Sequence, residues 1–284
     1  MLGPNKLWKL MNKLDRTLIA GPWVGEFGWE LFAWQAYVRR LSRHYNRTII
    51  ICRESSKGIY QDFADEFYFH NITGGASDAF FMHGIDLGNE LKKIIKNSNI
   101  QLNDKTTLLT PRRIGWPPDT HYTEQFSFGN ISITPEYIIF SGEEPNKNYD
   151  FVFHARNRQL RIQDNWAPEK WETLLQKLGG TCASIGSKEE SLHVEGTDDL
   201  RGIPLDELFS VTAKAKCILG PSSGPMHLSS LCNTPHLVWS RPENRLRYEE
   251  NWNPHKTPVL FLDEHSWHPS AEYVYEKYMD WKHD

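Results

Sequence analysis

The segment "CILGPSSGPMHLSSLCNTPHLVW", residues 217–239, decides the fold class of this 284-residue chain. The apolar run "CILG" ends at a loop of small residues, a helix-like stretch follows, and a second apolar run, "PHLVW", comes next. Two short apolar runs separated by a helical pattern are typical of a strand–helix–strand unit with parallel strands. The segment therefore predicts an α/β domain built on a parallel sheet.

The same alternation of strand and helix patterns runs through both halves of the chain. Residues 111–148 interrupt it, because they are rich in Pro, Gly and Asn and show little periodicity. We therefore predict an N-terminal Rossmann-like domain over residues 1–145, with 111–148 as irregular linker, and a C-terminal domain over 146–284 whose last helix packs back on the N-terminal domain. The weaker strand candidates are "EFYFHNI" (66–72), "KTTLLTPR" (105–112), "EYIIF" (136–140) and "TPVLFLD" (257–263).

Composition narrows the class of protein. Aromatic residues make up 13% of the chain, which argues against disorder, and the net charge of -4 argues against a generally basic nucleic-acid binder. The four cysteines have no CxxC spacing, which favours free thiols over a zinc site and fits a reducing compartment. No run of about 18 apolar residues and no signal-peptide pattern is present, so we expect a cytoplasmic protein without a membrane span.

The small-residue loop of the opening segment has the composition of an anion-binding site. Ligands of parallel α/β sheets bind at the carboxyl ends of the strands, where a helix N-terminus presents unpaired N–H groups. Ser222 and Ser223 add hydroxyl groups, Gly224 permits close approach, and His227 lies early in the following helix. The competing interpretation is an ordinary helix cap with Ser223 at the N-cap position.

Two further predicted strands end in residues that could bind a phosphorylated nucleotide. His154, Arg156, Arg158 and Arg161 follow the predicted strand "YDFVFHAR", and Gly186 ends "TCASIG", where a nucleoside could lie against the backbone. A solvated basic loop is the alternative explanation for the arginines. Three such strand ends in one sheet together favour a site for a phosphorylated nucleotide.

The stretches "NWAPEKWETLLQKL" and "DLRGIPLDELFSVTAKAKCILGPSSGPMHLSSLCNTPHLVW" resemble the donor half of glycosyltransferase family 9, the heptosyltransferase-like enzymes. The resemblance covers roughly residues 149–240. It implies a GT-B fold, with two Rossmann-like domains facing a cleft, a nucleotide-sugar donor on the C-terminal domain, and an acceptor on the N-terminal domain. It also implies chemistry without a metal ion.

The resemblance assigns the donor loop to residues of the opening segment. Its members are Ser222, Ser223, Gly224, Met226 and His227. Many family members carry Asp where this chain has Ser222, so the heptose assignment stays open, as do the nucleotide and the acceptor.

Inverting transfer needs a base that takes the proton of the acceptor hydroxyl, and the sequence offers two candidates. Glu26 lies in the loop after the first predicted strand, and Glu30 lies one helical turn later. Glu26 is our first choice because it lies in the loop; the alternatives are that Glu26 caps the helix and that Glu30 lies on a solvated face. Acceptor-side residues would be Gly25, Gly28, Trp29, Arg53 and Arg113.

Several functions remain open at this stage. The arginines between Arg39 and Arg53 could form a solvated helix face or bind an anionic acceptor, such as a glycan, a glycolipid or modified DNA. The alternatives to a general glycosyltransferase are therefore a phage-type enzyme that glycosylates a hydroxymethylated DNA base, a nucleotide or sugar-phosphate binding module, and a sugar-nucleotide epimerase. A carboxylate at Glu26 favours an enzyme over a binding module.

Overall fold

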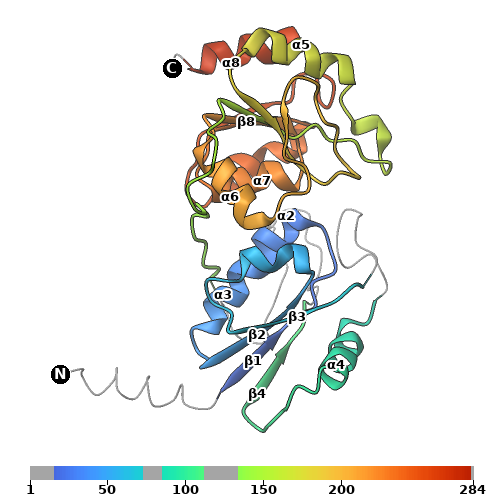
Figure 1. The fold of residues 1–284 in the computed structure, drawn as a ribbon, viewed down its shortest axis with the longest axis vertical. Helices are drawn as coiled ribbons and strands as arrows, with labels where there is room; N and C mark the ends of the chain where they lie inside the picture. Colours follow the sequence, from blue (N-terminus) through green and yellow to red (C-terminus); the bar gives the residue numbers. More distant parts are fainter. Residues whose placement is uncertain (1–15, 73–84, 112–133, 283–284) are drawn as a thin grey trace, which may run out of the picture. The chain divides into compact units, whose positions relative to one another are not determined.

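The computed structural model describes residues 16–72, 85–111 and 134–282 (Figure 1). The chain forms two compact units, Met1–Glu136 and Tyr137–Asp284. The boundary lies after residue 136 and not after residue 145, because residues following 136 pack on the second unit. The Phe140 N–H donates to Leu231 O at 2.8 Å, and its ring stacks on Phe209 at 4.6 Å between centroids. The segment "EYIIF" is not a strand, so that prediction is wrong.

Within the described residues, the first unit contains a parallel sheet in the order β3-β2-β1-β4. Its strands are β1 (Thr17–Ala20), β2 (Arg47–Cys52), β3 (Glu66–Phe69) and β4 (Thr106–Leu109). One face packs on α4 (Leu87–Asn97) through an apolar cluster that includes Ile19, Ile49 and Leu91. The other face is covered by the continuous helical segment α2 (Phe27–Trp29), η1 (Glu30–Gln35) and α3 (Ala36–Ser42) (Figure 1).

The second unit contains a larger parallel sheet, whose order among the described strands is β10-β9-β8-β5-β6-β7. The strands are β5 (Phe151–Phe153), β6 (Cys182–Ser184), β7 (Asp198–Asp199), β8 (Cys217–Pro221), β9 (His236–Trp239) and β10 (Val259–Leu262). Numbered from β5, this is the doubly wound order 3-2-1-4-5-6 read in reverse. The parallel α/β organisation predicted from the opening segment is confirmed.

Helices cover both faces of the second sheet (Figure 1). α5 (Pro168–Leu178) and α8 (Ala271–Lys282) lie on one face, and α6 (Leu205–Lys214) and α7 (Gly224–Leu231) lie on the other. Val274 and Tyr278 of α8 join the buried cluster of this unit, and the Tyr278 ring meets Phe151 edge-on at 5.3 Å. The last helix therefore contributes to the core of the second unit, and its packing on the N-terminal domain stays a prediction.

Each sheet has a point where the strand order reverses, and loops leaving the two central strands diverge there. In the first unit this point lies between β1 and β4, beside the loop that carries Glu26. In the second unit it lies between β5 and β8, so the segment after His154 and the loop from Ser222 start side by side. Most of the predicted site residues thus follow strands at these two points.

Candidate functional site

A hydrogen bond joins the two loops at the reversal point of the second sheet. Ser223 Oγ lies 2.8 Å from His154 Nδ1. Burial, reinforced by the positive charges of Arg156 and Arg158, lowers the pKa of His154 to about 3, so this imidazole is neutral near pH 7. In the tautomer with the proton on Nδ1, the ring donates to Ser223, whose own O–H can then donate to a ligand. Ser223 is the N-cap residue of α7 by position, but its side chain makes no capping hydrogen bond.

Tyr248, a residue that the sequence analysis did not identify, forms hydrogen bonds with the loop that contains Ser222 and Ser223. Its hydroxyl oxygen accepts from the Ser223 N–H at 3.0 Å and donates to Ser222 Oγ at 3.1 Å. The Ser222 N–H donates to Trp239 O at 3.0 Å. Two amides of the loop are therefore already engaged, so a bound anion would rely more on side chains than the sequence suggested.

His227 and Met226 lie in the interior of the second unit. His227 is 4% exposed, stacks on Tyr248 at 4.0 Å and meets Trp252 edge-on at 4.6 Å. Burial lowers its pKa well below the usual value. Met226 is fully buried, and its sulfur would lie 2.9 Å from a Cβ added at Gly220. In this arrangement His227 supports the loop through Tyr248, and a direct contact with phosphate stays a prediction.

The buried carboxylate of Asp164 forms ion pairs with arginines that follow two different strands. Asp164 is 1% exposed and follows β5 in the short helix η5 (Ile162–Asp164). Its carboxylate lies 3.9 Å from Arg156 Nη1, 4.0 Å from Arg161 Nη1 and 3.7 Å from Arg241 Nη2. Arg156 is buried over the Trp267 ring, whereas the Arg241 side chain is 55% exposed just after β9. This arrangement places basic groups beside the Ser222 loop.

Arg158, the remaining basic residue predicted on this loop, points to another partner. Its guanidinium lies 3.6 Å from the Glu190 carboxylate. Asn165 closes the loop by accepting from the Arg158 N–H and donating to the Arg158 carbonyl. Arg158 is therefore part of a closed loop that faces the β6–β7 connection.

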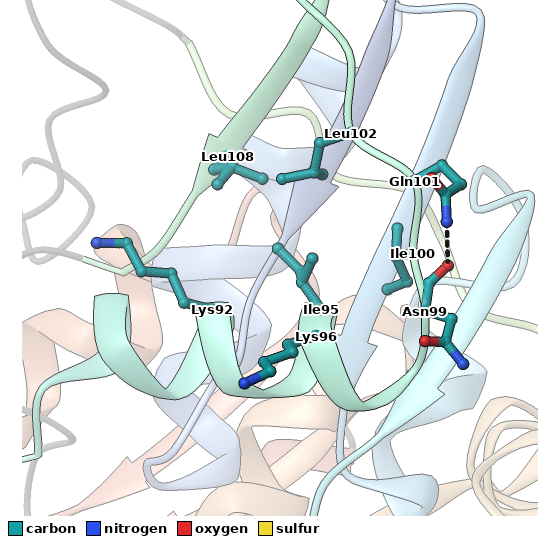
Figure 2. Close-up of a pocket in the computed structure, with 8 residues that line it drawn as sticks. All are labelled: Lys92, Ile95, Lys96, Asn99, Ile100, Gln101, Leu102 and Leu108. Carbon is teal, nitrogen blue, oxygen red and sulfur yellow. Dashed lines mark hydrogen bonds between the residues drawn. The ribbon is translucent and has the colours of Figure 1, made fainter.

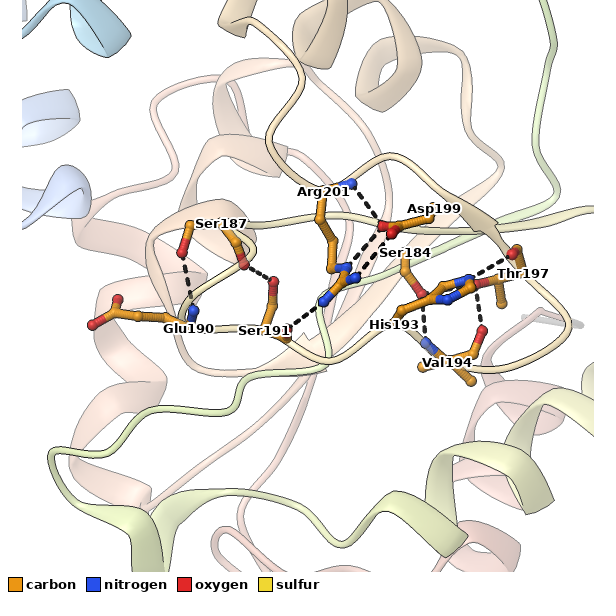
Figure 3. Close-up of polar contacts among 9 residues, drawn as sticks. All are labelled: Ser184, Ser187, Glu190, Ser191, His193, Val194, Thr197, Asp199 and Arg201. Carbon is orange, nitrogen blue, oxygen red and sulfur yellow. Dashed lines mark hydrogen bonds and ion pairs between the residues drawn. The ribbon is translucent and has the colours of Figure 1, made fainter.

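The turn after β6, where Gly186 is predicted to contact a nucleoside, is closely packed within the protein. Gly186 has φ +119°, and a Cβ there would lie 2.6 Å from Ser191 Oγ and 2.9 Å from His154 Cδ2. The loop after β6 thus packs directly against this glycine. Figure 3 shows how the loop is fixed, with the Arg201 guanidinium between the Asp199 carboxylate and the Ser191 carbonyl. Gly186 permits close packing within the protein, and its contact with a nucleoside stays a prediction.

In the first unit, the predicted base Glu26 lies at the start of α2, directly after the loop that follows β1. It occupies the N-cap position in extended conformation, with no capping hydrogen bond from its side chain. Gly25 and Gly28 beside it are buried, and Trp29 is 3% exposed. The interpretation of Glu26 as a helix cap is therefore not supported, and its role as base is compatible with this half-buried loop position.

Glu30 does not lie on the solvated face expected from its helical position. It is 1% exposed at the start of η1, a π-helical segment of a kind often found at functional sites. Its carboxylate accepts from the Tyr60 hydroxyl at 2.7 Å and from the Ser56 hydroxyl at 2.8 Å. Burial raises the pKa of Glu30 to about 7, although both hydrogen bonds and the charge of Arg53 oppose this rise.

Side chains from the ends of the next two strands hold the Glu26 loop. Arg53, which follows β2, donates through Nη1 to the Gly25 carbonyl at 2.9 Å. His70, which follows β3, places Nε2 3.1 Å from the Trp23 carbonyl. Burial and the charge of Arg53 lower the pKa of His70 to about 4. Arg113, the other basic acceptor-side candidate, lies outside the described residues.

Two surface hollows of the first unit lie away from these loops. One, of about 310 Å³, is lined by Lys92, Ile95 and Lys96 of α4, by Leu108 of β4 and by residues 99–102 of the segment that joins them (Figure 2). The other, near Arg16 and Asn103, lies at the amino ends of the strands.

In the described part of the chain, no group of three or more His, Cys, Asp or Glu side chains is placed to hold a metal ion. No helix there combines the length and apolarity needed to span a membrane.

No protein-family model and no curated protein sequence matches the chain. Solved structures resemble it over nearly their whole length, among them the following three. The family 9 glycosyl transferase from Veillonella parvula DSM 2008 has a TM-score of 0.57 and 12% identity, over 95% of this chain and 90% of that one. The E. coli ADP-heptose lps heptosyltransferase II gives 0.58 and 13%, over 94% and 98%. The E. coli heptosyltransferase WaaC with ADP gives 0.55 and 13%, over 94% and 99%.

At these identities the likeness concerns the fold. It extends over both units, whereas the resemblance in sequence covers mainly residues 149–240. The resemblance to glycosyltransferase family 9 is confirmed at that level, and with two parallel α/β sheets the chain has the GT-B fold.

Proposed function

We propose that the chain is a glycosyltransferase that moves a sugar from a nucleotide-sugar donor to an acceptor hydroxyl. The observation that carries this proposal is the coincidence of the GT-B fold with a polar strand-end site at the reversal point of the second sheet. Each of the three similar structures bears the name of a glycosyltransferase, and one of them was solved with ADP.

The donor diphosphate would bind at the carboxyl ends of β5, β8 and β9. Ser222 and Ser223 offer hydroxyl groups, and Gly224 is the first residue of helix α7. Arg241 offers an exposed guanidinium. Guanidinium groups make charge-assisted hydrogen bonds to phosphate oxygens, which strengthen as negative charge develops on the leaving group. Side-chain cations would thus supply the stabilisation without a resident metal ion.

Transfer would proceed with inversion at the anomeric carbon. The acceptor oxygen forms a bond to that carbon, the bond to the diphosphate oxygen breaks, and the diphosphate leaves with the electron pair. The Glu26 carboxylate takes the proton of the acceptor hydroxyl. This step needs a carboxylate near the acceptor, and we assign that role to Glu26, the N-cap residue of α2.

The first experiment is a melting scan of the full chain with UDP, GDP, ADP, CMP and dTDP, each with and without Mg²⁺. A ligand at about 100 times its dissociation constant adds about 2.7 kcal/mol of stability. We expect one nucleoside diphosphate to raise the melting temperature equally with and without Mg²⁺. No shift with any of the five would count against the donor site, and a shift only with Mg²⁺ would count against metal independence.

The second experiment tests the proposed base once a donor is known. Glu26→Gln should lower kcat about 10²- to 10⁴-fold because the amide cannot take a proton, while the affinity for the donor stays unchanged. The matched control is Glu54→Gln, since Glu54 is exposed after β2. Turnover retained in Glu26→Gln would remove Glu26 from the mechanism.

A further inference from the structure

Three carbonyl groups around Glu26 are held by different parts of the first unit. The Trp23 carbonyl lies against His70, the Gly25 carbonyl accepts from Arg53, and the Glu26 carbonyl accepts from the Glu30 N–H at 3.1 Å. The peptide that joins Gly25 to Glu26 is therefore fixed by a guanidinium on one side and by the start of the helix on the other.

Glu30 also binds the segment that supplies Arg53. Tyr60 and Ser56 donate to its two carboxylate oxygens, and both belong to or directly follow η2 (Glu54–Ile59), the short helix that begins after Arg53. Arg53 in turn lies close enough to Glu30 for its charge to favour the ionised carboxylate. Glu30, in the helical segment that follows Glu26, thus bonds the segment after Arg53 and interacts with the charge of Arg53.

We propose that Glu30 and Arg53 are positioning residues for Glu26: the ionised Glu30 carboxylate attracts the Arg53 guanidinium, which holds the Gly25 carbonyl and with it the peptide that carries Glu26. The inference rests on the proposed function, which assigns Glu26 as the base. Neither Glu30 nor Arg53 needs to touch the substrate, since both act through the loop.

Among the described titratable groups next to Glu30, the others keep one charge state near neutral pH, whereas Glu30 changes its charge there. Within residues 52–60 it interacts with Cys52, Arg53, Ser56 and Tyr60, and the charge of Lys57 acts on Cys52. Burial raises the pKa values of the Cys52 thiol and the Tyr60 hydroxyl, so both stay neutral, and His70, with a pKa of about 4, is neutral as well. Ionisation of Glu30 is therefore the event in this cluster that strengthens its hold on Arg53.

Glu30→Gln tests the proposal because the amide keeps the size of the side chain and removes its charge. We expect kcat at pH 8 to fall about 10- to 100-fold through misplacement of Glu26, with the dissociation constant of the donor nucleotide unchanged. The melting temperature at pH 8 should rise, because the buried charge is gone. A merely structural carboxylate would give the opposite sign, so a lowered melting temperature with lowered kcat would overturn the proposal, as would wild-type kcat.

Tyr60→Phe provides a second variant that keeps the carboxylate. Loss of the Tyr60 donor removes an interaction that favours ionised Glu30 and should raise its pKa. Wild-type kcat should fall as the pH drops through about 7, this inflection should move to higher pH in Tyr60→Phe, and it should disappear in Glu30→Gln. An inflection that stays unchanged in both variants would overturn the proposal.

A third readout does not depend on turnover and separates this inference from the proposed function. Hydrogen exchange of the amides at residues 24–27, which can open locally while Glu30 stays buried, should be slower at pH 8 than at pH 6 in the wild type after correction for the intrinsic rate. Glu30→Gln and Arg53→Gln should show the faster exchange at both values. Equal protection in all three proteins overturns the inference, whereas absence of any nucleotide effect on the wild type would count against the proposed function alone.

Discussion

At the scale of single residues, Glu30 links stability to pH. Its pKa in the folded chain is about 7 against an ordinary value of 4.5, because burial disfavours the carboxylate. The unfolded chain therefore releases this proton at lower pH than the folded chain. The free energy of unfolding should decrease as the pH rises from about 4.5 to about 7.

Glu30→Gln should remove this pH-dependent cost. The difference between the two pKa values corresponds to about 3 kcal/mol, so the variant should exceed the wild type by about that amount at pH 8.5 and match it near pH 4.5. Urea unfolding at several pH values measures the difference, with Glu54→Gln as the exposed control. A variant less stable than the wild type at pH 8.5 contradicts the prediction.

Arg241 is the residue on which we expect diphosphate affinity to depend most directly. Its guanidinium is exposed after β9 and is anchored by the buried Asp164. Arg241→Gln should weaken binding of a nucleoside diphosphate about tenfold, and the corresponding nucleoside much less, since hydrogen bonds to charged groups are the stronger ones. Isothermal titration of both ligands measures this preference.

Arg245 offers a matched control for that experiment. It follows Arg241 closely in sequence, but its guanidinium is held by Asp263 at 2.8 Å and by Glu249 at 2.7 Å. Arg245→Gln should leave the preference for the diphosphate unchanged. Equal losses in the two variants would mean that general positive charge, and not the anchored Arg241, attracts the ligand.

At the scale of elements, the turn after β6 supports the loop after β8 through one side chain. A methyl group at Gly186 would collide with Ser191 and His154, and His154 is the residue that bonds Ser223. Gly186→Ala should therefore cost about 2 to 3 kcal/mol in unfolding free energy and weaken nucleotide binding.

Gly179 isolates the backbone contribution to that effect. It also has positive φ, +62°, but a Cβ there would meet nothing within 4 Å. Gly179→Ala should cost about 1 kcal/mol and leave nucleotide binding unchanged. Urea unfolding and calorimetry of both variants provide the comparison, and similar binding losses in the two would contradict the role of the Gly186 contact.

The elements themselves were largely predictable because they are short-range patterns. α5 begins with Pro168 and ends before Gly179, as its sequence indicates. The segment at Glu136–Phe140 is not a strand as predicted, because Phe140 stacks on Phe209 and its N–H donates to Leu231 O at the end of α7 instead of to a strand. The β-strand β7 was missed because Asp198 and Asp199 carry no apolar signal.

At the scale of the whole molecule, each unit has its own sheet and its own buried cluster. Unfolding of the full chain need not be two-state for that reason. We expect a nucleoside diphosphate to slow hydrogen exchange most strongly within residues 137–284, at the carboxyl ends of β5, β8 and β9. Protection found mainly within residues 16–111 would contradict the assignment of the donor to the second unit.

The sequence by itself determined the α/β class, the two-part organisation and the strand ends at which Ser223, His154 and Glu26 lie. Periodicity and the resemblance of residues 149–240 to a known family predict these features, because both are patterns formed by residues close together in sequence. Only the tertiary structure decided that Glu30 is buried, that Tyr248 occupies the Ser223 N–H, and that Asp164 gathers Arg241. The burial of a polar group and its hydrogen-bond or ion-pair partners depend on residues far apart in sequence. A local sequence pattern therefore does not predict which groups come into contact.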